Sequence, residues 1–318
     1  MTVRTLTLSP GFDHDVVVDR IDPGCVGAVL QWKTHASGKG LNVSRTIRAL
    51  GGDTVAYAVV GDSEAAAFTA LAERDGYAVS SVVIEQPMRN NLTLRVGDHG
   101  ATAGHAAGRR FSDVPEQAVR DLFDRLLADI SPGDVVSFNG SLPDNSRPTV
   151  WAERAGEIHA RGALLFADVQ GEAMLRLLET RLVVAAKPNH DESRALSEPG
   201  EGRQPLDDAL AAIRRMHSLG VADPIVTLGA MGALHVDGDL IVRSECPCDA
   251  SRIEVGAGDA FVAGYCAGVD VVAWQGCRPV ALGLATASAH VDGFDGDDLA
   301  SRVEGRLARI VTEVLEPL

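Results

Sequence analysis

Short apolar runs alternate with amphipathic segments along most of the chain. The runs at 3–8, 54–60 and 163–167 have the length and the composition of buried strands. Between such runs, the segment 42–50 repeats apolar residues at helical spacing and is followed by two glycines that end it. Because strands that alternate with helices form βαβ units, the pattern predicts a mostly parallel sheet covered by helices on both faces.

Four segments do not fit this alternation and predict a small appended sheet. They are 16–21, 26–34, 91–96 and the polar, glycine-rich 101–108. The fold class is therefore α/β, with a doubly wound, mostly parallel sheet and a small β-sheet lid. We expect a single domain over residues 1–318, with the lid formed from about 14–35 and 88–107. Three helices near 258–274, 279–291 and 299–315 are expected to close the chain.

Composition narrows the class of protein. The chain has 29 lysines and arginines against 44 aspartates and glutamates, a net charge of −15, which argues against nucleic acid or an anionic membrane as the main partner. Its five cysteines lack the spacing of a zinc or redox site and are expected to be reduced thiols. No apolar run of signal-peptide length precedes Asp13, and no stretch is apolar enough to span a bilayer, so we expect a cytoplasmic protein.

The segment 255–264 carries the sharpest chemical signal. Gly256 and Gly258 precede a helix made almost wholly of small apolar residues, which must be buried. The first turn of such a helix offers unpaired N–H groups and the positive end of the helix dipole, so it can cradle a phosphate group. Asp259 falls in that first turn. The alternative is an aspartate that only caps the helix.

This segment and four others resemble the signatures of the PfkB (ribokinase-like) carbohydrate kinases. The second long signature is Ala-Ser-Gly-Lys-Gly-Leu-Asn-Val-Ser-Arg at 36–45. The shorter motifs are Asn-Gly-Ser-Leu-Pro at 139–143, Lys-Pro-Asn-His-Asp-Glu at 187–192 and Thr-Leu-Gly-Ala-Met-Gly at 227–232. The Gly-Lys-Gly-Leu-Asn and Lys-Pro-Asn forms resemble the branch that contains 1-phosphofructokinase and tagatose-6-phosphate kinase. The resemblance covers nearly the whole chain and implies a ribokinase-like fold, ATP as phosphoryl donor and Mg²⁺ as cofactor.

The resemblance assigns roles around the phosphate cradle. It implies that Asp259 is the base, with an anion hole formed by the backbone of Gly256, Ala257 and Gly258, as phosphoryl transfer to an alcohol requires. Asn189 and Glu192 are implied to organise Mg²⁺ through water; on spacing alone they equally suit a capping box. The residues implied to contact the nucleotide are Lys187, Thr227, Gly229 and Gly232. The alternative for Lys187 is a solvated lysine at a strand end, and the alternative for the turn at 229–232 is a plain hairpin.

The sugar side is expected at the other signature. The candidate residues are Asp13, Gly38, Lys39, Asn42, Arg89 and Ser141. Asp13 and Asn42 suit sugar hydroxyls, and Ser141 adds a hydroxyl of its own. Lys39 and Arg89 form a pair of cations that suits a phosphate already present on the sugar. The alternative for Lys39 is a solvated lysine on the surface, and the alternative for Arg89 is a position in a surface turn.

Together these residues predict an ATP- and Mg²⁺-dependent kinase of a ketohexose phosphate, converting fructose 1-phosphate to fructose 1,6-bisphosphate. The alternatives are a kinase for tagatose 6-phosphate, fructose 6-phosphate or an unphosphorylated sugar or nucleoside, and a non-catalytic sugar-phosphate-binding regulator. Departures from the family pattern at 9–13, 104–108 and 251–254 leave specificity and a monovalent-cation site open. Because an exposed two-stranded ribbon is marginal alone, we expect a homodimer through paired lids.

Overall fold

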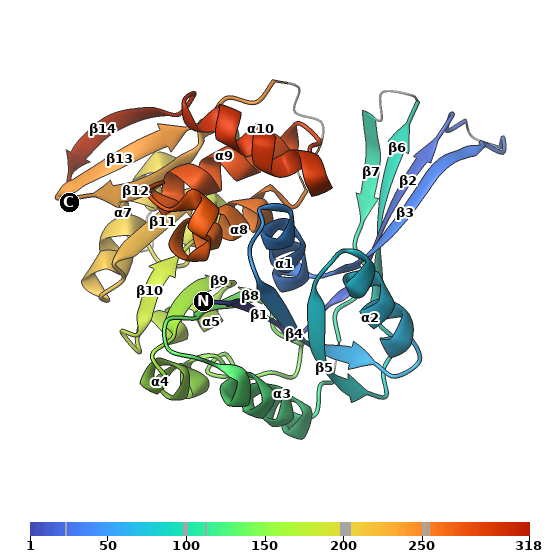
Figure 1. Cartoon of the computed structure of the whole chain (residues 1–318), viewed down its shortest axis with the longest axis horizontal. Coiled ribbons are helices and arrows are strands. Elements are labelled where there is room, and N and C mark those ends of the chain that lie inside the picture. Colours follow the sequence, from blue (N-terminus) through green and yellow to red (C-terminus); the bar gives the residue numbers. More distant parts are fainter. Residues whose placement is uncertain (23, 98–100, 112, 198–204, 250–252, 254) are drawn as a thin grey trace.

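A ten-stranded sheet runs through the molecule in the computed structural model, which describes all residues except 23, 98–100, 112, 198–204, 250–252 and 254 (Figure 1). The strand order is β14-β13-β12-β11-β10-β9-β8-β1-β4-β5. The strands from β11 to β5 are parallel, and β12, β13 and β14 are antiparallel. Their bounds are β1 Val3–Thr7, β4 Thr54–Gly61, β5 Ala78–Ile84, β8 Val135–Gly140, β9 Leu164–Val169, β10 Val183–Ala186, β11 Asp223–Thr227, β12 Ala233–Asp237, β13 Leu240–Glu245 and β14 Val311–Pro317.

Helices cover both faces of this sheet. In Figure 1, α1, α8, α9 and α10 lie together on one side, and α3 and α4 lie on the other. The helices are α1 Lys39–Ala49, α2 Ala65–Arg74, α3 Glu116–Asp129, α4 Ala152–Ala160, α5 Glu172–Leu178, α6 His190–Ser193, α7 Pro205–Ser218, α8 Ala257–Asp270, α9 Pro279–Val291 and α10 Leu299–Leu307. None of the helices described is long and apolar enough to cross a membrane.

Helix α8 is packed from all sides, as its composition predicts. Every residue from 259 to 267 is buried. A Cβ at Gly264 would lie 2.6 Å from the carbonyl oxygen of Leu282, and a Cβ at Gly283 would lie 2.9 Å from that of Phe261. The two glycines therefore allow α8 and α9 to approach closely, and this contact fixes the direction in which the first turn of α8 points.

A separate four-stranded sheet projects from the body as a lid (Figure 1). Its order is β3-β2-β6-β7, with β2 Gly11–Val18, β3 Val29–Ser37, β6 Arg89–Val96 and β7 Ala101–Ala106. Asp13 of β2 lies opposite His35 of β3 and Asn91 of β6 in the strand register. Because side chains alternate between the faces of a strand, Arg89 and Asn91 share one face of the lid with Asp13.

The doubly wound α/β fold with a small β lid is confirmed, and three details of the element predictions are wrong. The helix expected at 299–315 ends at Leu307, and 311–317 forms β14, because its β-branched residues pair with the otherwise bare edge of β13. The lid strands expected at 16–21 and 26–34 are β2 and β3, whose ends differ because β2 pairs with β3 on one side and with β6 on the other. Strand β5 was not expected, because its serines hide its apolar pattern.

Candidate active site

The first turn of α8 begins at a glycine in the left-handed region. Gly256 is the N-cap residue, with φ 88°, and no side chain caps the helix. A side chain there would be strained, and its Cβ would lie 3.1 Å from Nε2 of His290. Asp259 is therefore not the N-cap residue, which was the alternative considered for it. The amides at the start of α8 face no capping side chain, as an anion site requires.

Asp259 lies in a buried and charged environment. Its side chain accepts a hydrogen bond of 2.8 Å from Nδ2 of Asn42, and the residue is only 8% exposed. Burial raises the pKa of Asp259 to about 6, against the opposing positive charge of Lys39. A carboxyl group with such a pKa is deprotonated at neutral pH and is still basic enough to accept a proton.

Asp168, at the end of β9, joins two lysines and was not predicted. Its Oδ1 lies 3.3 Å from Nζ of Lys39 and 3.2 Å from Nζ of Lys187. Asp168 is fully buried, and its Oδ2 has no hydrogen-bond partner in the described part of the chain. Burial alone would raise the pKa of this carboxyl, but the two ammonium groups hold it below its ordinary value. The sequence signal was a carboxylate directly after the buried run 163–167, at the carboxyl end of a parallel strand.

The two lysines face the first turn of α8. Lys187 is buried, so the alternative of a solvated lysine at a strand end is wrong, and a Cβ at Gly258 would lie 3.4 Å from its Nζ. Lys39 also lies 3.9 Å from Oε1 of Glu192. Burial lowers the pKa of Lys39, but the carboxylates around it outweigh burial and raise that pKa above its ordinary value. The ammonium group of Lys39 therefore stays charged.

Asn189 and Glu192 form the capping box that spacing alone allowed. Oδ1 of Asn189 accepts from the Glu192 amide at 2.8 Å, and Oε2 of Glu192 accepts from the Asn189 amide at 2.9 Å. The other oxygen, Oε1, accepts from Gln170 at 3.0 Å. Among the described residues no three His, Cys, Asp or Glu side chains come together as a metal site. The free oxygen of Asp168 and the carboxylate of Glu192 nevertheless fit a Mg²⁺ ion that keeps most of its waters.

The loop after β11 lies beside this capping box. The amide of Thr227 donates to the carbonyl of Pro188 at 3.1 Å, and Thr227 forms a parallel bridge with Asn189. A Cβ at Gly232 would overlap the carbonyl of Ser244, so packing alone requires that glycine. A Cβ at Gly229 would meet nothing within 4 Å, which leaves space for a ligand against the backbone there.

The residues expected on the sugar side meet at the root of the lid. Asp13 accepts a 2.6 Å hydrogen bond from Nδ2 of Asn91 and another from the hydroxyl of Ser37. Arg89 is half-buried, and its buried Nε has no hydrogen-bond partner in the described structure. Burial lowers the pKa of Arg89, and the nearby Asp13 carboxylate opposes that shift.

Lys39 and Arg89 as a pair of cations around one sugar phosphate stay a prediction. Lys39 lies 3.3 Å from Oδ1 of Asp168 and 3.9 Å from Oε1 of Glu192. Gly38 approaches the backbone of Pro10, and Gly140, which precedes Ser141, lies against the stem of Lys39. Residues 251, 252 and 254, on which the question of a monovalent cation depends, lie outside the described residues.

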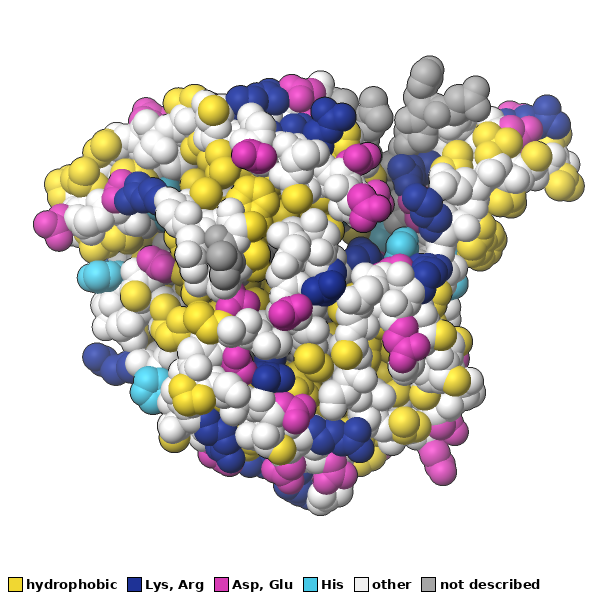
Figure 2. All heavy atoms as spheres, viewed as in Figure 1, with side chains coloured by type: hydrophobic (Ala, Val, Ile, Leu, Met, Phe, Trp, Pro, Cys, Tyr) yellow, Lys and Arg dark blue, Asp and Glu magenta, His cyan; other side chains and the backbone are white. Residues whose placement is uncertain are grey.

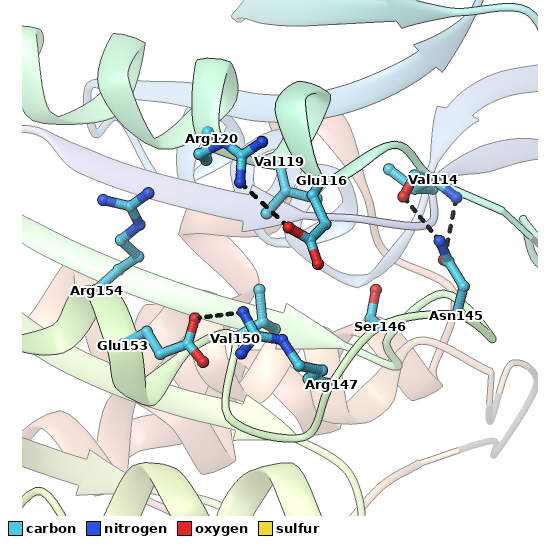
Figure 3. A pocket seen from close by; sticks show the side chains of 10 residues that line it. All are labelled: Val114, Glu116, Val119, Arg120, Asn145, Ser146, Arg147, Val150, Glu153 and Arg154. Atoms are coloured by element: carbon cyan, nitrogen blue, oxygen red, sulfur yellow. Dashed lines mark hydrogen bonds and ion pairs between the residues drawn. The ribbon is translucent and has the colours of Figure 1, made fainter.

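The described part of the chain encloses two cavities of different size. A cavity of about 510 Å³ runs along α1 and is lined by residues that include Arg45 and His290. In Figure 2, Lys, Arg and His side chains gather where the lid meets the body, despite the negative charge of the whole chain. A smaller cavity of about 110 Å³ lies between α3 and the loop before α4 (Figure 3). No residue proposed for the site lines either cavity, so we assign neither cavity a part in the chemistry.

Comparisons with known proteins find relatives over most of the chain. A family model described as pfkB family carbohydrate kinase matches residues 10–293. A 1-phosphofructokinase from Xanthomonas campestris pv. campestris is 30% identical over 88% of this chain and 89% of its own length. The ATP-dependent 6-phosphofructokinase isozyme 2 from Escherichia coli is 28% identical over 82% of this chain and 83% of its own length. The structure of a possible 1-phosphofructokinase from Thermotoga maritima superposes with a TM-score of 0.81 at 19% identity, over 99% of this chain and 100% of that one.

Proposed function

The chain belongs to the pfkB family of carbohydrate kinases and is 1-phosphofructokinase-like, and from this premise we propose that it phosphorylates fructose 1-phosphate to fructose 1,6-bisphosphate. Membership of the family implies ATP as a substrate. The observation that carries the proposal is the position of Asp259, a buried carboxylate at the open start of α8 on which the positive charges of Lys39 and Lys187 act. The relative from Xanthomonas campestris, named a 1-phosphofructokinase, supports the choice of acceptor.

In the proposed mechanism Asp259 removes the proton from the acceptor hydroxyl. The hydroxyl oxygen forms a bond to the γ-phosphorus of ATP, the bond from that phosphorus to the β–γ bridging oxygen breaks, and ADP leaves. The amides of Gly256, Ala257 and Gly258 and the ammonium groups of Lys39 and Lys187 bind the charge on the transferred group. Mg²⁺, held through water by Asp168 and Glu192, would neutralise charge on the phosphate oxygens.

On the sugar side we propose that Asp13 and Asn42 bind hydroxyls and that Arg89 binds the phosphate the sugar already carries. Arg89 has a buried, unpartnered Nε and shares a lid face with Asp13, so a bound phosphate would complete its hydrogen bonds. We propose that Lys39 serves the transferred group, since it lies with the nucleotide-side residues. On the nucleotide side, Thr227 and Gly229 would contact ATP together with Lys187. Ser141 would add a hydroxyl near Lys39.

Fructose 6-phosphate is the second candidate acceptor, because the relative from Escherichia coli is named a 6-phosphofructokinase. A panel of sugars and sugar phosphates, assayed for ADP release with ATP and Mg²⁺, decides between them. We expect the highest kcat/KM with fructose 1-phosphate. A preference for fructose 6-phosphate or tagatose 6-phosphate would reassign the substrate, and a preference for a free sugar or nucleoside would remove the role of Arg89. Binding of a sugar phosphate without turnover would favour a non-catalytic regulator.

We further propose that the protein forms a homodimer through its lids. Trp32 and Leu92 lie on the lid face opposite to Asp13, and they are 59% and 37% exposed. We expect Trp32→Glu to convert the dimer to a monomer in sedimentation velocity at micromolar concentration, because a buried charge would destabilise the apolar contact. Val314→Glu, at an equally exposed valine of β14, is the control and should leave the dimer intact. A wild-type monomer would contradict the proposal.

A further inference from the structure

Ser37 lies between the sugar-side carboxylate and the side chain that contacts the base. Its hydroxyl contacts a carboxylate oxygen of Asp13 and, at 3.1 Å, Oδ1 of Asn42. Ser37 is 1% exposed, at the last position of β3, directly before the loop into α1. A buried hydroxyl with these two neighbours links the lid to the body of the protein.

The orientation of the Asn42 amide decides what Asp259 experiences. With Oδ1 towards Ser37 and Arg45, Nδ2 donates to Asp259 at 2.8 Å and stabilises the carboxylate form. With the amide reversed, Oδ1 would face the carboxylate oxygen and the ionised base would be disfavoured. Two donors hold the productive orientation, the hydroxyl of Ser37 and, at the longer distance of 3.3 Å, Nη2 of Arg45.

We propose that Ser37 is a positioning residue, which holds the Asn42 amide so that it donates to Asp259 and orients the Asp13 carboxylate towards the sugar. This inference rests on the proposed function. Ser37 touches neither the reacting hydroxyl nor the phosphoryl group in this scheme and acts only through its two neighbours. Because a serine has one hydroxyl hydrogen, it donates to Asn42 or to Asp13 at any moment, so the two residues share its support.

Other charges also act on Asp259 and must be considered in any pH measurement. The groups that face it are Lys39 on α1, Asp168 on β9 and Lys187 after β10. Around Ser37 itself the charged groups are Asp13, Arg45 and Arg89. A substitution of Ser37 changes none of these charges, so a shift in the titration of Asp259 would report the orientation of the Asn42 amide.

The test compares Ser37→Ala with the wild type and with Ser44→Ala. We expect Ser37→Ala to move the acid limb of kcat/KM upward from about pH 6 by about half to one pH unit, the size of one hydrogen bond to the charged form. We also expect KM for the sugar phosphate to rise. Ser44 is the matched control, because it is buried on α1 and bonded to Thr5 and Thr54 away from the site. Its variant should lose stability without moving the acid limb.

A titration of the Asp259 carboxyl carbon by NMR in the resting protein separates this inference from the proposed function. The signal is identified by its absence in Asp259→Asn. If the wild type turns over no sugar phosphate, the proposed function fails, and the titration still decides whether Ser37→Ala raises the pKa of Asp259. An unchanged titration in Ser37→Ala, or an equal shift in Ser44→Ala, would overturn the positioning role.

Discussion

Replacing Asp259 with asparagine is expected to lower kcat by about 10²–10⁴-fold, because a general base contributes rate enhancement of that size. The amide keeps the shape of the side chain and can still accept the hydrogen bond from Asn42, but it cannot take the hydroxyl proton. ATP and the sugar phosphate should still bind with nearly unchanged affinity. Steady-state ADP release and equilibrium binding of both ligands measure the two effects separately.

The same substitution is expected to stabilise the folded protein at neutral pH. Burial raises the pKa of Asp259 from 3.8 to about 6, so the folded state resists ionisation of this group. The resulting penalty is absent below pH 3.8, grows as the pH rises to about 6 and is then complete, at about 3 kcal/mol. Thermal unfolding at pH 5 and at pH 8 should therefore show a larger gain in Tm for Asp259→Asn at pH 8.

Asp270, at the other end of α8, offers a matched control. Its side chain is 2% exposed, and burial raises its pKa as well. We expect Asp270→Asn to alter stability while leaving turnover at the wild-type level. Wild-type turnover in Asp259→Asn would instead show that the proton leaves by another route and would refute the role of the base.

The sequence predicts the fold correctly where strand-like and helix-like apolar patterns repeat along the chain. The featureless helix after Gly256 had to be buried, and its open first turn follows from the two glycines. The lid was visible as strands that did not alternate with helices. The structure of the C-terminal segment was harder to predict from the sequence. Residues 311–317 have an apolar spacing that suits a helix, and they form a strand only by pairing with β13.

A residue of the candidate site was predictable from the sequence where it stands in or beside a recognisable motif. Asp259 stands in a glycine-rich motif, and Asn42 follows a second one. Asp168 has no such motif, and only the fold shows that it lies between Lys39 and Lys187. Lys39 stands in a motif, but its ion pairs with Asp168 and Glu192 depend on which strand ends meet across the sheet. Ser37 was part of a quoted signature, and its contacts depend on the register of the lid strands.

Replacing Arg89 with alanine is expected to raise KM for the sugar phosphate by about 10²-fold, the loss of a charge-assisted and bidentate contact, while kcat changes little. Arg89 is half-buried at the start of β6, and its buried Nε lacks a partner in the described structure, so a bound phosphate would be its natural acceptor. Since the lost contact is equal in the ground state and the transition state, the effect should fall on KM. For an unphosphorylated sugar the variant and the wild type should behave alike.

Two further variants decide whether Arg89 acts through its charge or through its shape. Arg89→Lys keeps the charge but loses the planar fork of donors, so we expect it to recover only part of the affinity. Arg95→Ala, on the same strand, is the control, because the charge of Arg95 is already paired with Asp15. If Arg89→Ala raises KM equally for the phosphorylated and the free sugar, the phosphate binds elsewhere. In that case Lys39, which bonds to Asp168 beside the anion hole, becomes the next residue to substitute.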